Sequence, residues 1–328
     1  MDLEGPSSSR SILMDRRWPA ETIYERNSEM PQPNQKGNAI THKYRSVQYP
    51  HWFFVPAAVI YATFYLLPSL ASLYFSFTRW TLSDSFFIGF DNFAQFFREP
   101  FLLKGLLNTM VYAVLTSGLK VSLGLLLAVL LTSDIIARSF LRAVMFFPVL
   151  VSTVGVGVTF TALMHPQHGA INSTLALMGL SGPGWLTNPA LAIFSVALVD
   201  VWKGIGLATV IYIAGIVSIP ADFYEAATLD GAGPVQRFWH ITLPLSRPAA
   251  ITVIILSFTG GLRSFDLVWT MTKGGPGFSS DVVASVIYKQ YQAGFYGLST
   301  AGNVVLFILI AVLVLPLSSW LNRGEVGA

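Results

Sequence analysis

The sequence predicts an all-α membrane protein that crosses the bilayer with six transmembrane helices. Only 11% of its 328 residues are charged and 53% are hydrophobic, whereas a soluble globular domain contains about 25% charged residues. Six stretches are also long and apolar enough for a membrane helix, which needs about 20 residues. We expect these spans at residues 51–75, 107–132, 140–164, 190–218, 248–271 and 300–320.

The segment before the first span differs from the rest of the chain in composition. Residues 1–50 are polar and rich in Arg, and they lack the apolar run and cleavage site of a signal peptide. We predict a cytosolic N-terminal tail at 1–50, a transmembrane domain at 51–321 and a C-terminal tail at 322–328. A helix that lies on the membrane surface around residues 11–26 is the alternative for the tail.

The distribution of positive charge predicts the orientation. More Lys and Arg residues lie on the side of the N-terminal tail than on the opposite side, so the positive-inside rule places both termini in the cytosol. We interpret the net charge of +3 as a sign of this orientation. We therefore expect contact with membrane lipid and no nucleic-acid partner.

The composition also argues against several kinds of chemistry. The absence of cysteine excludes a disulfide framework, a thiolate zinc site, an iron–sulfur cluster and a cysteine nucleophile. His165 and His168 have no acidic residue near them in the sequence, so we expect no metal site. An intramembrane enzyme would need a cluster of His, Glu or Ser residues, and the sequence shows none. We therefore expect no catalytic residue.

The loop at 220–247, between the fourth and fifth spans, is the most informative segment. Pro220 favours the start of a short helix, and Gly231 favours its end in a left-handed conformation. A second short helix is expected over 234–241, and Pro244 is expected to stop it. The loop therefore contains a helix, a glycine and a second helix.

The first of these helices has a face with a low profile. Phe223, Ala226, Ala227 and Asp230 share that face through their spacing of three and four residues. The alanines allow the backbone of another protein to approach closely, and Glu225 adds a charge at the rim. An amphipathic helix that rests on lipid head groups is the alternative interpretation.

The same loop resembles the EAA loop of bacterial ATP-driven importer permeases. That pattern is EAA, three residues, G, nine residues, I, one residue and LP, and Glu225-Ala226-Ala227, Gly231, Ile241 and Leu243-Pro244 match it at every spacing. Phe265-Asp266-Leu267 and the later TKGGP at 272–276 are similar to a second pattern of the carbohydrate branch, which includes the maltose and glycerol-phosphate importers. The outer segment IGFDNF at 88–93 resembles a loop of that branch as well. The resemblance covers about residues 50–322.

This resemblance implies the fold of type I ATP-binding-cassette importer permeases and a location in the bacterial inner membrane. A second permease subunit, expected to be a different chain, would complete the pore, and a periplasmic solute-binding protein would deliver the sugar. Two cytosolic ATPase subunits would dock on the EAA loop and bind ATP and Mg, so this chain, which has no G-x-x-x-x-G-K-[ST] phosphate loop, is expected to bind no cofactor. The implied ATPase-coupling residues are Glu225, Ala226, Ala227, Asp230, Gly231, Ile241, Leu243 and Pro244.

Charged residues inside the spans are candidates for the substrate pathway, because a charge at the bilayer centre costs roughly 2.5–3.5 kcal/mol. Mutual pairing of these charges within the helix bundle is the structural alternative, and the pairs Asp200 with Lys203 and Arg263 with Asp266 could also partly neutralise each other within one helix. The Gly260-Gly261 pair either weakens the fifth span at a binding site or allows close helix packing. The pathway candidates are Lys120, Asp200, Lys203, Arg263 and Asp266, with Trp202 and Trp269 for stacking on sugar rings.

We therefore predict the transmembrane subunit of an ATP-driven importer that forms half of the pathway for a carbohydrate by alternating access. A large acidic oligosaccharide such as alginate would suit basic residues in the pore. A non-sugar solute such as a polyol phosphate is the alternative within the class. A stand-alone secondary transporter or channel is the alternative from another class, and it would need no ATPase-docking loop.

Overall fold

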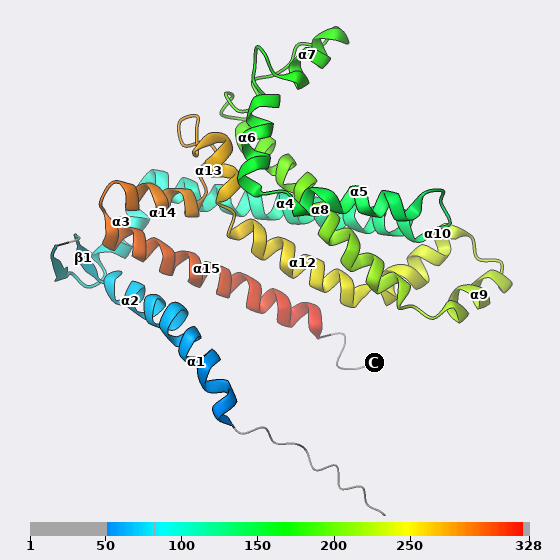
Figure 1. Ribbon diagram of the computed structural model, residues 1–328, viewed down its shortest axis with the longest axis horizontal. Coiled ribbons are helices and arrows are strands. Elements are labelled where there is room, and N and C mark those ends of the chain that lie inside the picture. Colours follow the sequence, from blue (N-terminus) through cyan, green and yellow to red (C-terminus); the bar gives the residue numbers. More distant parts are fainter. Residues whose placement is uncertain (1–50, 82, 324–328) are drawn as a thin grey trace, which may run out of the picture. The chain divides into compact units, whose positions relative to one another are not determined.

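A computed structural model describes residues 51–81 and 83–323 of the chain (Figure 1). The tail predicted at 1–50 lies outside the described residues, as do residues 324–328 of the predicted C-terminal tail. The chain divides into two units, Met1–Pro56 and Ala57–Ala328. In the first unit the described residues form the 3-10 helix η1, His51–Phe54, and the start of α1, Val55–Tyr61.

The second unit is mostly helical, as predicted, but it also contains a β-hairpin that the apolar pattern does not predict. Strand β1, Thr78–Trp80, pairs antiparallel with β2, Ser85–Phe87. The helices are η2 (Ala62–Leu66), α2 (Leu67–Phe75), α3 (Asp91–Arg98), α4 (Pro100–Thr132), α5 (Arg138–Leu150), α6 (Thr153–Leu163), α7 (Ala170–Leu177), α8 (Ala192–Val217), α9 (Ala221–Leu229), α10 (Pro234–Arg237), η3 (Phe238–Thr242), α11 (Leu243–Leu245), α12 (Arg247–Leu262), α13 (Asp266–Thr272), α14 (Val283–Gln292) and α15 (Tyr296–Asn322).

Several of these helices are long and apolar enough to cross a membrane. Among the described residues there are four such stretches, Trp52–Phe75, α4, α8 and α15, and up to six if each of two bent pairs is one span. The bent pairs are α5 with α6, at 97°, and the segment from α10 to α11 with α12, at 67°. The predicted number of spans is thus reached when both bent pairs are counted.

The third predicted span, 140–164, is broken rather than continuous. Helices α5 and α6 meet at an angle of 97°. Pro148 lies in the last turn of α5 and cannot donate a backbone hydrogen bond there, and after Leu150 the chain leaves the helix, with ψ of 140° at Val151 and 133° at Ser152. The third predicted span is therefore a pair of helices that meet at a sharp bend.

The fifth predicted span, 248–271, is also interrupted, so its predicted extent is wrong. A short non-helical segment separates α12 from α13, and Phe265 in that segment has φ and ψ of −138° and −58°. The pair Gly260-Gly261 lies just before the break, and glycine has low helix propensity. At its other end α12 bends by 67° into the helices of the preceding loop.

Helices α4, α8 and α12 pack closely through small residues, as membrane helices commonly do. A Cβ at Gly124 of α4 would lie 2.9 Å from the Cβ of Ala208 on α8, and one at Gly261 of α12 would lie 2.7 Å from the Cα of Ala113 on α4. A Cβ at Gly260 would meet no atom within 4 Å. Close packing therefore explains Gly261 but not its neighbour.

The two ends of this helical unit differ in structure (Figure 1). We call one the hairpin end, where β1, β2, α3 and α14 lie, and the other the loop end, where α9 and α10 lie. At the hairpin end the buried side chain of Asn92 donates hydrogen bonds to the carbonyls of Ser76 and Thr78, at 2.9 and 2.8 Å. These bonds attach α3 to the hairpin.

Candidate functional site

Helix α9 carries the first half of the EAA motif and ends where the sequence predicts. Gly231 has a φ of +79°, the left-handed conformation that glycine adopts without steric cost. Its N–H donates to the carbonyl of Thr228 at 3.1 Å, and the N–H of Ala232 donates to that of Ala227 at 2.8 Å. These two bonds form a Schellman motif, which satisfies the last carbonyls of the helix.

Two side-chain hydrogen bonds hold α9 against the helices that follow it. The hydroxyls of Tyr224 and Thr242 lie 3.0 Å apart, and Nη1 of Arg237 donates to the hydroxyl of Thr228 at 3.1 Å. Neither bond depends on the charged or alanine residues of the motif. The loop is therefore a defined helical hairpin rather than a flexible connection.

The second helix of the loop continues beyond its predicted end. Pro244 was expected to stop it, but α10 passes through the wider π-helical turn η3 into α11, which contains Pro244. The N–H of Leu243 donates to the carbonyl of Phe238, five residues back. A proline ring in a regular α-helix clashes with the carbonyl four residues before it, and the wider turn relieves this clash.

The face of α9 that points away from the rest of the loop is not covered by any residue that the structure describes. None of its residues is buried, and the large apolar side chains of Phe223 and Leu229 are 50% and 89% exposed. Glu225, Ala226 and Asp230 are exposed beside them. An apolar surface of this kind rimmed by charge is typical of a protein interaction site.

The remaining coupling candidates are divided between this surface and the interior of the loop. Pro244 is exposed, whereas Ile241 and Leu243 are half-buried. Ala227 lines a groove of about 330 Å³ between α9 and the second helix, together with Arg237. Ala227, Ile241 and Leu243 are thus packed within the loop, whereas Glu225, Ala226, Asp230 and Pro244 are exposed.

A buried ion pair joins two of the pathway candidates. Nζ of Lys120 on α4 lies 2.7 Å from Oδ2 of Asp200 on α8, and Lys120 is 8% exposed. The lysine side chain crosses Gly204, where a Cβ would lie 2.7 Å from its Cε. Pairing of the charges within the bundle is thus confirmed for these two residues, but the partner of Asp200 is Lys120 on α4 rather than Lys203 on its own helix, because Gly204 leaves room for the Lys120 side chain.

The other expected pair, Arg263 with Asp266, is not formed. Both side chains are exposed beside the break between α12 and α13, and no ion pair within 4 Å joins them in this described segment. Trp269 is half-buried on α13, Lys203 is half-buried on α8, and Trp202 is exposed and packs against Phe160. The candidates thus separate into a buried pair and a more exposed group.

Tyr112 is a polar residue beside the ion pair that the sequence analysis missed. Its side chain is fully buried on α4, close to the carboxylate of Asp200 and to Ser264 in the break. Its hydroxyl has no hydrogen bond of good geometry to any described residue. It lies two helical turns before Lys120 on the same face, and this spacing is the signal that could have identified it.

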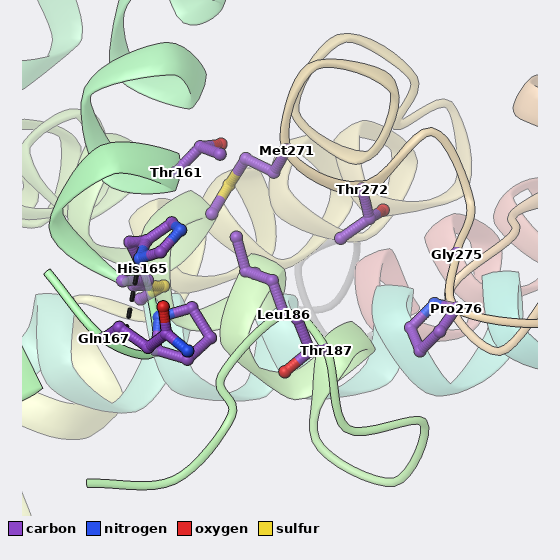
Figure 2. A pocket seen from close by; sticks show the side chains of 11 residues that line it. Thr161, His165, Gln167, Leu186, Thr187, Met271, Thr272, Gly275 and Pro276 are labelled. Carbon is purple, nitrogen blue, oxygen red and sulfur yellow. Dashed lines mark hydrogen bonds between the residues drawn. The ribbon is translucent and has the colours of Figure 1, made fainter. Parts of the chain in front are cut away.

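A cavity of about 580 Å³ opens among α6, α13 and the loops that follow them (Figure 2). Figure 2 shows the side chain of Met271 directed toward the ring of His165, with Thr161 above and Pro276 on the opposite wall. Nδ1 of His165 accepts the backbone N–H of Gln167 at 3.3 Å, so this ring is held by its own loop.

One wall of the cavity is the loop of the GGP motif, which a buried carboxylate holds in place. Asp281 is fully buried and accepts hydrogen bonds from Nζ of Lys289 at 2.6 Å and from the hydroxyl of Ser285 at 2.8 Å. It lies directly against Gly274, where any side chain would overlap it. Asp281 lies outside the predicted spans and the recognised motifs, which is why the sequence analysis did not select it.

The chain matches a known protein family over residues 120–324, the binding-protein-dependent transport system inner membrane component. A probable ABC transporter permease of Bacillus subtilis, YurN, is 32% identical over 84% of this chain and 97% of its own. The trehalose/maltose transport system permease MalF of Thermococcus litoralis is 30% identical over 82% and 92%. The arabinooligosaccharide permease AraP of Bacillus subtilis is 29% identical over 84% and 90%.

A solved structure has the same fold. It is the crystal structure of a bacterial ABC transporter involved in the import of the acidic polysaccharide alginate, in which one chain aligns with a TM-score of 0.75 and 23% identity. The alignment covers 83% of this chain and 94% of that chain. The predicted importer-permease fold is therefore confirmed.

Proposed function

Because the chain belongs to the family of binding-protein-dependent transport system inner membrane components, we propose that it is the transmembrane subunit of an ATP-driven carbohydrate importer. It is a multi-pass membrane protein. As such a subunit it forms half of a pathway that opens alternately to the two sides of the bacterial inner membrane.

The substrates for which two of the relatives are named support a carbohydrate substrate. Two of them are named for the transport of trehalose and maltose and of arabinooligosaccharides. The structural neighbour imports alginate, and the exposed Arg263 beside the helix break would suit an acidic oligosaccharide of that kind. A polyol phosphate is the alternative substrate, because it also combines hydroxyl groups with negative charge.

The exposed face of α9 is the observation that carries the proposal. An ATPase subunit that covers Phe223 and Leu229 would remove apolar surface from water, and Glu225 at the rim would face a basic residue of that subunit. The ATPase pair would bind ATP and Mg, and this chain would bind neither. A second permease subunit of different sequence and a periplasmic binding protein complete the assembly.

The loop is built to transmit motion from the ATPases to the spans. Helix α9 is hydrogen-bonded to the segment from α10 to α11, which continues through a 67° bend into α12. Helix α12 packs against α4 where Gly261 meets Ala113. A displacement of α9 by ATPase closure would thus reach α12 and α4, which is the rigid-body motion that alternating access requires.

The test is a charge reversal on the exposed face of α9. Glu225→Lys in the reconstituted importer should abolish solute-stimulated ATP hydrolysis and weaken retention of the ATPase subunits, while membrane insertion is unchanged. Asp84→Lys is the matched control, because Asp84 is an exposed acidic residue in the turn between β1 and β2 and forms no ion pair with any residue that the structure describes. Normal coupling in Glu225→Lys would contradict the proposed docking role.

A further inference from the structure

Seven aromatic side chains form a continuous series from the hairpin to the break between α12 and α13. The centroids of successive rings lie 4.1, 5.4, 5.3, 6.4, 4.8 and 5.8 Å apart. We call this series the aromatic ladder. In order its members are Phe75, Trp80, Tyr296, Tyr291, Tyr288, Trp269 and Phe265.

The ladder differs from an aromatic core. Tyr112 and Tyr212 are fully buried among helices, whereas every ladder residue is partly or largely exposed, and Tyr291 is 56% exposed. The hydroxyls of its three tyrosines and the indole N–H groups of its two tryptophans make no hydrogen bond with any residue that the structure describes. Each ring thus keeps part of its apolar surface exposed, and the Tyr and Trp members also carry polar groups that can still bind a ligand.

The course of the ladder also differs from that of an aromatic belt at the membrane surface. A belt surrounds a protein at one level of the bilayer. Helix α12 has 16 residues and rises about 24 Å, less than the hydrocarbon thickness of about 30 Å. If α12 starts at one membrane face, Phe265 after its end lies inside the bilayer, whereas Trp80 lies in the hairpin beyond the first span. On this placement the ladder changes depth along its length, which a belt does not.

We propose that the aromatic ladder is a binding track for the sugar rings of an oligosaccharide, leading from the hairpin end to the helix break. This inference rests on the proposed function as a carbohydrate importer. One face of a pyranose ring presents C–H groups that stack on an aromatic ring, and its hydroxyls bond to phenol and indole groups. The spacing of the rings is on the order of the length of one sugar unit, so several units can stack at once.

The chemistry of such a track predicts selectivity for chain length rather than for sugar identity. An aromatic face accepts any pyranose, so each added sugar unit gains one more stacking contact. The exposed charges of Arg263 and Asp266 lie beside Phe265 at the deep end, where they can select among sugars. The ladder should therefore lower KM more for a long oligosaccharide than for a short one.

The test replaces ladder rings by an apolar side chain that cannot stack. Tyr288→Leu and Tyr291→Leu are compared with Tyr61→Leu and Tyr65→Leu, because Tyr61 and Tyr65 also stack on each other, at 4.9 Å, and are also exposed, but lie off the ladder. The complete importer, with its ATPases and binding protein, is assayed in proteoliposomes. The probes are the disaccharide and pentasaccharide of alginate and, in parallel, maltose and maltopentaose.

Each ladder substitution should raise KM for the pentasaccharide about two- to tenfold, the range of one lost aromatic contact, with a smaller change for the disaccharide. Tyr288→Phe keeps the flat ring and should retain most of the length dependence. If the ladder variants behave like the controls, or raise KM equally for both lengths, the ladder is not a sugar track although the importer function stands. If the wild-type assembly transports neither the alginate nor the maltose oligosaccharides, the proposed carbohydrate function is wrong, and the proposed sugar track is then wrong as well.

Discussion

Nζ of Lys120 lies 2.7 Å from Oδ2 of Asp200, and this ion pair joins α4 to α8, which also pack closely where Gly124 meets Ala208. Removal of one partner leaves an uncompensated buried charge, which costs about 3–5 kcal/mol, whereas removal of both leaves none. Lys120→Met and Asp200→Leu should therefore each lower the melting temperature in detergent, and the double variant should recover much of the loss. Equal stability of the single and double variants would show that the pair is not coupled.

The two neighbouring glycines of α12 should respond differently to substitution. Gly261→Ala places a methyl group against the backbone of Ala113, so it should destabilise the folded state by about 1–3 kcal/mol. Gly260→Ala enters open space and should be neutral or stabilising by up to about 1 kcal/mol. Thermal unfolding of the purified protein measures both changes, and a similar loss in the two variants would contradict the observed packing.

The end of α9 depends on the left-handed conformation of its glycine. Gly231→Ala should cost about 1–2 kcal/mol locally, because its φ of +79° is strained for any residue with a Cβ. Gly233→Ala is the matched control, since this glycine has a φ of −73° and open space around it. We expect reduced solute-stimulated ATP hydrolysis only in the first variant. If both variants couple normally, the Schellman motif is not needed for docking.

The buried carboxylate of Asp281 should determine the order of the GGP loop. Asp281→Asn replaces the charged partner of the Lys289 ammonium group by a neutral amide and should cost about 1.5–3 kcal/mol, because Lys289 is partly exposed to water. Hydrogen exchange at residues 273–282 should then accelerate. Asp84→Asn, in the exposed turn between β1 and β2, should leave this exchange unchanged. Unaltered exchange in Asp281→Asn would show that other contacts hold the loop.

The backbone preferences of single residues predicted those features of the coupling loop that depend only on residues near in sequence. The left-handed glycine at 231 follows from the backbone preference of that residue, and the structure confirms it. Pro244 was misjudged because a proline can continue a helix when a wider turn precedes it, and η3 supplies that turn. The break after α12 follows Gly260-Gly261, which the sequence analysis interpreted either as a weak point of the span or as a site of close packing, and local rules do not decide between the two.

The sequence by itself determined the membrane class, the apolar spans and the motif that led to the family, because each depends on composition or on short spacings. Only the tertiary structure decided which charges meet. Lys120 and Asp200 are eighty positions apart, and Gly204 allows their contact only once α4 and α8 are packed. The aromatic ladder likewise joins residues from β1, α13, α14 and α15. Contacts between distant segments depend on how helices pack, and packing is a property of the folded chain rather than of any local stretch.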